Sequence, residues 1–202
     1  MNHGELKTYV RTLINRSDLT DPLVVQFIQQ AQDRLERVLR PAFLQHFLTF
    51  SLDGTGGDFR VPSDFLKLID LYTDDGKIKR KDVAQWLKFP NLQGVPEAFI
   101  QTGHDIRMRP FPPAATVIYL HYYGVEPELV ADSDSNYWTS ATVDAFAYAA
   151  VALAADFFED ERLAGFEAKF QLSKSEIESQ QEDEDTTGST EISPAYSYPE
   201  DY

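Results

Sequence analysis

The sequence predicts an α+β protein: a helical bundle formed by N- and C-terminal helices, with an inserted antiparallel β-domain and an extended C-terminal tail. Apolar residues recur at helical spacing near both ends, whereas short aromatic and β-branched runs separated by turn signals fill the middle. Of the 202 residues, 43% are hydrophobic, enough for one substantial core or two small ones. We expect N-terminal helices over residues 1–42, the β-domain over 43–136, C-terminal helices over 137–181 and the acidic, tyrosine-containing tail over 182–202.

Two amphipathic helices are expected before residue 41. A first short helix carries an apolar stripe and ends in the polar run from Asn15 to Thr20. The second begins at Asp21-Pro22, because a carboxylate can cap a helix and proline is tolerated in its first turn. It should stop at Arg40, before Pro41. The two stripes consist of Leu6, Tyr9, Val10, Leu13 and Ile14, and of Val24, Phe27, Ile28, Ala31, Leu35, Val38 and Leu39.

The middle of the chain is expected to form an antiparallel sheet or a small sandwich. Gly54-Thr55-Gly56-Gly57 lacks the Lys-Ser or Lys-Thr of a phosphate-binding loop, so we interpret it as a hairpin turn. A helical turn or two is expected at Asp82 to Phe89, and a polar connection at Gly124 to Trp138. The expected strands are Phe47 to Leu52, Phe59 to Val61, Phe65 to Tyr72, Phe99 to Gln101, Ile106 to Arg109 and Thr116 to Tyr123.

Helical spacing returns in an alanine-rich segment from Val143 to Phe158, whose small side chains suit the centre of a bundle. Asp160 can cap the next helix, which carries a stripe of Leu163, Phe166, Phe170 and Ile177. Asp144, Asp156 and Glu159 to Glu161 are interpreted as charges on helix faces and caps rather than as paired catalytic carboxylates.

The net charge of −15 is concentrated at the C-terminal end. From Glu176 onward there are nine acids and no lysine or arginine, while the remaining body carries 24 acids against 18 bases, or −6. Such a surface repels phosphate, so sequence-specific binding of DNA or RNA is not expected. A protein beside passing DNA gains from the same repulsion.

The tail is too polar to form a packed core, yet its end carries apolar side chains spaced by prolines that favour an extended backbone. A segment that served solubility alone would not need three tyrosines. We expect these side chains to contact a partner protein, and they are Ile192, Tyr196, Tyr198 and Tyr202.

No set of residues converges on a catalytic, cofactor or metal site. The chain has no cysteine, so disulfides, thiolate zinc sites and cysteine nucleophiles are excluded. Asp132, Asp134 and Asn136 match the first ligands of a calcium loop, but the later glycine and glutamate are missing, so we expect an ordinary polar loop. His121 is expected on one face of a strand, and His3, His46 and His104 near the surface.

The order of elements resembles the head-to-tail connector adaptors of tailed bacteriophages, the family that includes adaptors of short-tailed phages. The resemblance covers residues 1 to about 178 and rests on ordered fold signatures rather than catalytic motifs. The matching segments are the Asp21-Pro22 helix up to Arg40-Pro41, Phe59-Arg60-Val61-Pro62-Ser63-Asp64-Phe65, Pro96-Glu97-Ala98-Phe99-Ile100, Ile106-Arg107-Met108-Arg109-Pro110-Phe111-Pro112-Pro113, the strand Ile118 to Tyr123, and Asn136-Tyr137-Trp138 before the alanine-rich helix.

The resemblance implies a structural virion protein of the neck, made in the host bacterial cytoplasm. It implies a twelve-subunit ring beneath the portal protein that lines the DNA exit channel, through which double-stranded DNA passes without specific binding. The tail would reach the portal protein, and the other face of the ring would receive tail or nozzle proteins. No enzymatic activity, cofactor, metal or membrane segment is expected.

Two other functions fit the same residues. The chain could be another neck component, a stopper or tail-completion protein with similar helices and strands. It could also be an acidic cytosolic binding module whose tail mimics nucleic acid. The basic cluster Lys77, Lys79, Arg80 and Lys81 is expected to be a solvated hairpin tip or one side of a protein contact, which in a ring could meet the acidic face of the next subunit.

Overall fold

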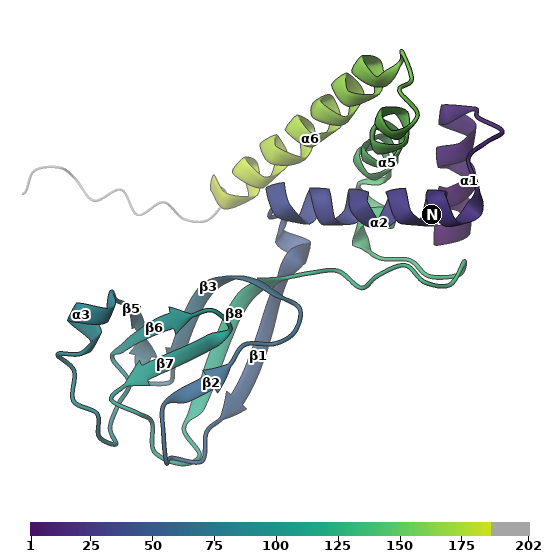
Figure 1. The fold of residues 1–202 in the computed structure, drawn as a ribbon. Coiled ribbons are helices and arrows are strands. Elements are labelled where there is room, and N and C mark those ends of the chain that lie inside the picture. Colours follow the sequence, from purple (N-terminus) through teal and green to yellow (C-terminus); the bar gives the residue numbers. More distant parts are fainter. Residues whose placement is uncertain (187–202) are drawn as a thin grey trace, which may run out of the picture. The chain divides into compact units, whose positions relative to one another are not determined.

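The computed structural model of the chain describes residues 1–186, with side chains described through residue 182. These residues have an α+β fold, as the sequence predicts, and they form two compact units (Figure 1). We call residues 1–41 together with the chain from residue 130 onward the helical unit, and residues 42–129 the β-domain. The segment 130–136 therefore lies with the helices, whereas the sequence suggested that it belongs to the β-domain.

The helical unit is organised around the alanine-rich helix α5 (Val143–Phe157), as its composition suggested. It contacts α1 (His3–Ile14), α2 (Asp21–Val38), α4 (Tyr137–Ala141) and α6 (Leu163–Thr186). Seven alanines of α5 are buried, and they lie on more than one side of the helix. Because the distance between packed helices depends on the size of the side chains at the contact, alanine allows several neighbours to approach closely.

Helix α2 begins one residue earlier than the capping prediction implies, so the assignment of Asp21 as the cap is wrong. Thr20 is the N-cap, and its side chain makes no capping hydrogen bond. Asp21 is the first helical residue, and its carboxylate pairs with Arg11 of α1. The ion pair occupies the carboxylate and ties the beginning of α2 to α1.

The predicted end of α2 at Arg40 is also wrong, because the helix ends at Val38 and Leu39 is its extended C-cap. Residues before proline avoid the α conformation, and here Pro41 ends the helix slightly earlier than expected. The Arg40 side chain instead donates hydrogen bonds to the carbonyl oxygens of Glu36 and Leu39. These bonds satisfy carbonyl groups that the end of a helix leaves without partners.

Helix α6 runs to Thr186, past residue 182 where the extended tail was expected to begin. Good helix formers occupy the end of this helix, namely Gln180, Gln181, Glu182 and Glu184. Arg34 of α2 contacts the N-terminal half of α6. Its guanidinium donates to Glu167 at 3.0 and 2.5 Å, and it lies 4.1 Å from the centre of the Phe170 ring.

A buried polar network joins α2 to α4. The carboxylate of Glu36, whose residue is 4% exposed, accepts hydrogen bonds from Trp138 Nε1 at 3.1 Å and from Gln32 Nε2 at 3.0 Å. Asn136 Nδ2 donates to Gln32 Oε1 at 3.2 Å, and the Asn136 side chain also caps α4. The sequence did not indicate this network, because Gln32 and Glu36 sit beside the apolar stripe of α2.

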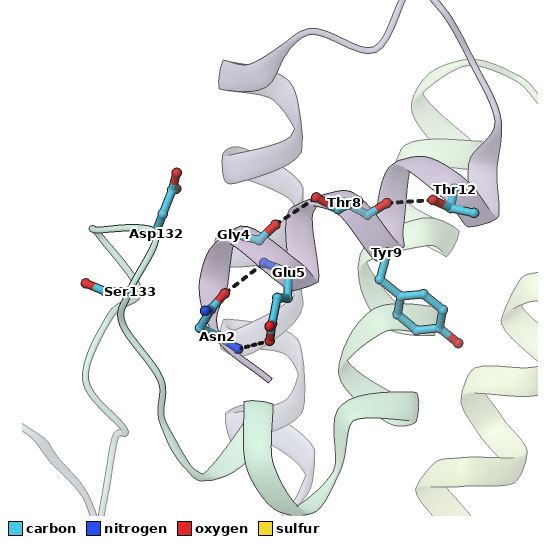
Figure 2. A pocket seen from close by; sticks show the side chains of 8 residues that line it. All are labelled: Asn2, Gly4, Glu5, Thr8, Tyr9, Thr12, Asp132 and Ser133. Carbon is cyan, nitrogen blue, oxygen red and sulfur yellow. Dashed lines mark hydrogen bonds between the residues drawn. The ribbon is translucent and has the colours of Figure 1, made fainter.

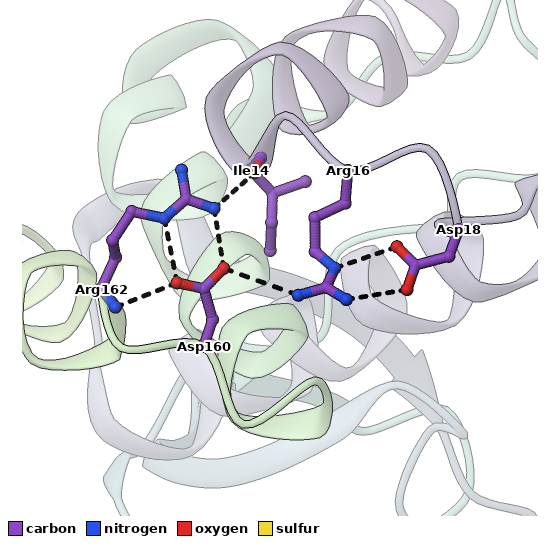
Figure 3. Close-up of polar contacts among 5 residues, drawn as sticks. All are labelled: Ile14, Arg16, Asp18, Asp160 and Arg162. Atoms are coloured by element: carbon purple, nitrogen blue, oxygen red, sulfur yellow. Dashed lines mark hydrogen bonds and ion pairs between the residues drawn. The ribbon is translucent and has the colours of Figure 1, made fainter.

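A second polar network joins the loop after α1 to the turn before α6 (Figure 3). Arg162 donates to Asp160 at 2.9 and 2.7 Å and to the carbonyl oxygen of Ile14 at 2.7 Å. Arg16 lies 3.9 Å from Asp160 and donates to Asp18 at 2.9 and 2.8 Å. Asp160 lies in the turn before α6, which begins at Leu163, and its carboxylate accepts a hydrogen bond from the backbone amide of Arg162 at 2.9 Å instead of capping the helix directly. Through Arg162 and Arg16 it connects this turn to the end of α1.

The β-domain is a sandwich of two four-stranded sheets, which Figure 1 shows face to face. After a 3-10 turn (Ala42–Leu44), the first sheet has the order β1 (Gln45–Ser51), β8 (Val117–Gly124), β3 (Phe65–Thr73), β4 (Gly76–Lys77). The second has the order β2 (Asp58–Arg60), β7 (Asp105–Arg109), β6 (Ala98–Thr102), β5 (Lys79–Arg80). The core between them includes Leu71, Ile78, Phe99, Ile106, Met108, Ile118 and Leu120.

Two expectations about the β-domain are wrong. The Gly54 to Gly57 segment is not a hairpin turn, because β1 pairs with β8 and β2 pairs with β7, so this loop carries the chain from one sheet to the other. The sheets are also not wholly antiparallel, since β5 pairs with β6 in parallel. The intervening helix α3 (Val83–Trp86) packs on the second sheet through Trp86, Ala98 and Ile100, which gives the chain room to return in the same direction.

Replacement of Glu36 by alanine should destabilise the helical unit by about 3 kcal/mol, because it leaves two buried donors without an acceptor. Urea unfolding followed by tryptophan fluorescence measures the change. Gln30→Ala, an exposed position on the same helix, is the matched control and should stay within about 0.5 kcal/mol of the parent. A Glu36→Ala variant as stable as the Gln30→Ala variant would show that the network contributes nothing.

The Asp160 network should make stability depend on acid pH. Hydrogen bonds from Arg162 hold the pKa of Asp160 well below its ordinary value. Its contribution is therefore fully present above the ordinary carboxyl pKa of about 4 and is lost as the pH falls through the lower folded value. We expect Asp160→Asn to unfold at lower urea than the parent at pH 7, with the difference shrinking below about pH 4. Asp156→Asn is the control, and a difference independent of pH would contradict this account.

Candidate functional site

The partner-binding residues expected from the sequence, Ile192, Tyr196, Tyr198 and Tyr202, lie outside the described residues. Within residues 1–186 the structure presents a cavity at the start of α1, an aromatic surface on the first sheet and a basic surface at β4 and β5. The side chains of each surface determine what it can bind or catalyse.

The cavity at the start of α1 has a volume of about 650 Å³ (Figure 2). Most of its polar groups are occupied within the chain: Glu5 and Asn2 form a reciprocal capping box, and the Thr8 and Thr12 hydroxyls donate to carbonyl oxygens one turn earlier. Asp132 pairs with Lys7. These groups already serve the helix and its neighbouring turn, so they do not form a set of converging polar groups of the kind that orients a small ligand. Its lining is Asn2, Gly4, Glu5, Thr8, Tyr9, Thr12, Asp132 and Ser133.

The residues that resemble part of a calcium loop have separate structural tasks. The Asp134 carboxylate accepts hydrogen bonds from the backbone amides of Val130 and Ala131 at 3.0 and 2.7 Å. Asp132 faces Lys7, and Asn136 caps α4. No group of three or more metal-binding side chains gathers anywhere in the described part of the chain.

The expectation that His3 lies near the surface is wrong, because the residue is 1% exposed. Its backbone amide donates to the carbonyl oxygen of Asp134 at 2.8 Å, and that of Gly4 donates to Asp132 at 3.0 Å. These two hydrogen bonds attach the turn at residues 132–134 to the beginning of α1. His3 is the first residue of that helix. His104 is exposed, and His121 lies on β8, as expected.

His46, Asp64 and Tyr122 form the cluster that comes nearest to a catalytic arrangement. Nδ1 of His46 lies 2.9 Å from Asp64 Oδ2, and the Tyr122 hydroxyl donates to the same carboxylate at 3.1 Å. Burial and the neighbouring Asp64 raise the pKa of Tyr122 to about 12, so this hydroxyl stays protonated at neutral pH. A Cβ on Gly124 would lie 2.5 Å from His46 Nδ1, so the backbone itself closes over the cluster. We interpret it as a structural contact that holds β1, β8 and the beginning of β3 together.

An aromatic surface covers the outer face of the first sheet. Phe47 is 57% exposed, and its ring centre lies 6.0 Å from Tyr72 and 5.5 Å from His121. Tyr72 and Tyr119 stack with ring centres 5.0 Å apart. Aromatic side chains exposed together are frequent in protein interfaces, because they bury a large area with few rotatable bonds.

A basic surface lies at strands β4 and β5. Three lysines line a cavity of about 390 Å³ there, and its lining is Asp75, Gly76, Lys77, Lys79, Lys81, Phe89, Val95, Pro96 and Glu97. Of the three lysines, Lys77 pairs with Asp70. No described acid lies within ion-pair distance of Lys79, Arg80 or Lys81. The cluster expected from the sequence is therefore present, beside apolar and acidic side chains that the sequence did not place there.

Charge is divided unequally between the two units. The β-domain carries 11 acids and 9 bases, and five of those bases fall between residues 77 and 88 with a single acid, Asp82. Residues 1–41 and 130–202 carry 22 acids and 9 bases. One chain thus combines a basic surface with a strongly acidic remainder, an arrangement that favours contact between different faces of identical subunits.

The groups that come nearest to catalytic arrangements are engaged in contacts within the chain. The hydroxyl hydrogen bonded to the His46–Asp64 pair is that of Tyr122, which stays protonated, and Asp160 in the α5–α6 turn pairs with Arg162. No described helix is both long enough and apolar enough to cross a membrane. What the described surfaces offer is protein contact by aromatic and charged side chains.

Comparison with known proteins identifies the family. A search of curated proteins found no significant match. The family model for the SU10 adaptor protein matches residues 1–194, which include both units and part of the sequence beyond α6. The chain therefore belongs to the SU10 adaptor protein family and is a head-to-tail adaptor of the bacteriophage virion neck.

Proposed function

We propose that this protein forms a ring that joins the portal protein to tail or nozzle proteins and lines the channel through which DNA leaves the head. The observation that carries the proposal is the family match over residues 1–194. The resemblance described above gives the ring twelve subunits. A ring needs two different complementary surfaces on each subunit, since its interfaces are heterologous and close by rotation.

The tail supplies the contact with the portal protein. Ile192, Tyr196, Tyr198 and Tyr202 are the side chains that we assign to this contact. Tyrosine buries a large area and immobilises few rotatable bonds, so a short segment can bind well. Because the ring already holds each subunit beside the portal, binding of its tail becomes effectively intramolecular.

The acidic composition suits a channel for DNA. With a net charge of −15, the protein repels phosphate and does not gain affinity from released counterions. DNA can then pass without a binding step that would delay its exit. The role is structural, and the chemistry of the described surfaces agrees with it.

Removal of the tail should weaken binding to the portal protein at least tenfold while leaving the folded units unchanged. The truncation is best placed after Thr186, because α6 extends that far and its Ile177 is buried. A full-length variant with Tyr196→Ser, Tyr198→Ser and Tyr202→Ser separates the tyrosines from the length of the tail. Binding is measured by sedimentation with purified portal protein and by electron-microscopy class averages of the complexes.

Tyr137→Ser provides the matched control, because this tyrosine is exposed on α4 and lies outside the tail. Rings on portal that are lost with the tail tyrosines and kept with Tyr137→Ser would support the proposal. A full-length chain that never binds portal would contradict it, and crosslinks to tail proteins alone would favour a stopper or tail-completion role.

Purified protein should not retain double-stranded DNA at physiological salt, and its affinity should show no steep dependence on salt. Fluorescence anisotropy of a labelled duplex at several salt concentrations measures this. Tight binding that falls by orders of magnitude as salt rises would overturn the assignment of a passive channel surface.

A further inference from the structure

The edges of both sheets meet in one short stretch of the β-domain. Strand β4 is the last strand of the first sheet, strand β5 is the last strand of the second, and Ile78 between them is buried in the shared core. Side chains on either side of Ile78 therefore point outward, and they are lysines. Lysine at a sheet edge commonly prevents unwanted strand pairing, so its presence alone does not indicate a binding site.

The cavity beneath these lysines provides the second observation. Lys77, Lys79 and Lys81 line it with two acids, Asp75 and Glu97, so the lysines outnumber the acids, and the apolar side chains of Phe89, Val95 and Pro96 lie beside them. Val95 is 51% exposed, so an apolar group lies open at the rim. A charge pair formed beside such apolar groups is screened less than one in open water. The surface therefore suits an acidic protein segment.

The same chain contains a segment of that chemistry. The end of α6, Glu176–Asp185, has six acids and no lysine or arginine. Glu176 and Glu182 are exposed, and they lie more than one helical turn apart. We call this segment the acidic end of α6.

Two copies with a net charge of −15 repel each other unless their contact brings opposite charges together. A contact between identical faces would place acid against acid or lysine against lysine. A contact between the basic surface of one copy and the acidic end of α6 of another instead pairs opposite charges. In the resulting pair, one copy still exposes its acidic end and the other its basic surface, so further copies can add in the same way. This is the geometry of a ring interface that closes by rotation.

We propose that Lys79 and Lys81 of each subunit bind the acidic end of α6 of the neighbouring subunit in the ring. This inference rests on the proposed function, because it specifies the interface of that ring. The tail tyrosines that we assign to the portal protein are not part of this contact.

The test is a charge exchange between two variants of the full chain. Variant A carries Lys79→Glu and Lys81→Glu, and variant B carries Glu182→Lys and Glu184→Lys. Variant A places acids against the acidic end of α6, whereas variant B lowers the net charge of that end from −6 to −2 and places two lysines against the basic surface. We therefore expect at least tenfold fewer rings from either variant alone, counted on portal by electron microscopy. An equal mixture alternates A and B around the ring, so every interface regains opposite charges and assembly should return.

Lys67→Glu is the control for variant A, because Lys67 is an exposed lysine of β3 away from the cavity. Lysine near the C-terminal end of a helix is favourable, so variant B should keep α6 folded, which circular dichroism verifies. Because the parent chain has no cysteine, the contact can also be trapped chemically. A Lys79→Cys, Glu182→Cys protein should give a ladder of disulfide-linked copies on mild oxidation, and a Lys67→Cys, Glu182→Cys protein should not.

Recovery of rings in the mixture together with the ladder supports the inference. Rings formed by A or B alone as readily as by the parent would overturn it, as would disulfides formed only within single chains. If the cluster instead binds a labelled DNA duplex and variant A abolishes that binding, the surface recognises phosphate and the inference is wrong. Portal binding by the tail is measured separately, so rings that ignore these charges would leave the proposed function standing.

Discussion

The burial of α5 is the constraint on which the helical unit depends. A helix buried on several sides has to present small side chains to its neighbours, and α5 does so with alanines that face α1, α2 and α6. This packing brings helices from both ends of the chain into one unit although the whole β-domain separates them in sequence. A large side chain in place of a central alanine such as Ala150 would separate helices rather than fill a gap.

Polar networks then fix the arrangement that apolar packing permits. Glu36 and Trp138 hold α4 on α2, while Asp160 and Arg162 hold the turn before α6 against the end of α1. Apolar contacts tolerate sliding, whereas hydrogen bonds between specific buried groups fail if a helix shifts by a fraction of a turn. Subunits that must repeat around a ring need such a fixed shape, because an error in one interface angle is multiplied at each step.

Charge has a different role from packing in this molecule. It contributes little to the fold of the β-domain, where most cations near residue 80 have no acidic partner among the described residues. In the ring that we propose, its distribution would direct assembly, since an acidic protein with one basic surface has a preferred way to meet its own copies. The same acidic excess would keep DNA from adhering in the proposed channel.

The sequence by itself determined the α+β class, the alanine-rich central helix, the positions of most strands and the basic cluster, because these depend on local spacing of side-chain types. The family resemblance pointed to a phage adaptor, which the match over residues 1–194 confirms. Only the tertiary structure decided that His3 and Glu36 are buried, that Gly54 to Gly57 crosses between sheets and that β5 runs parallel to β6. Those features arise from contacts between residues far apart in the chain, such as Trp138 with Glu36, and local periodicity contains no information about such partners.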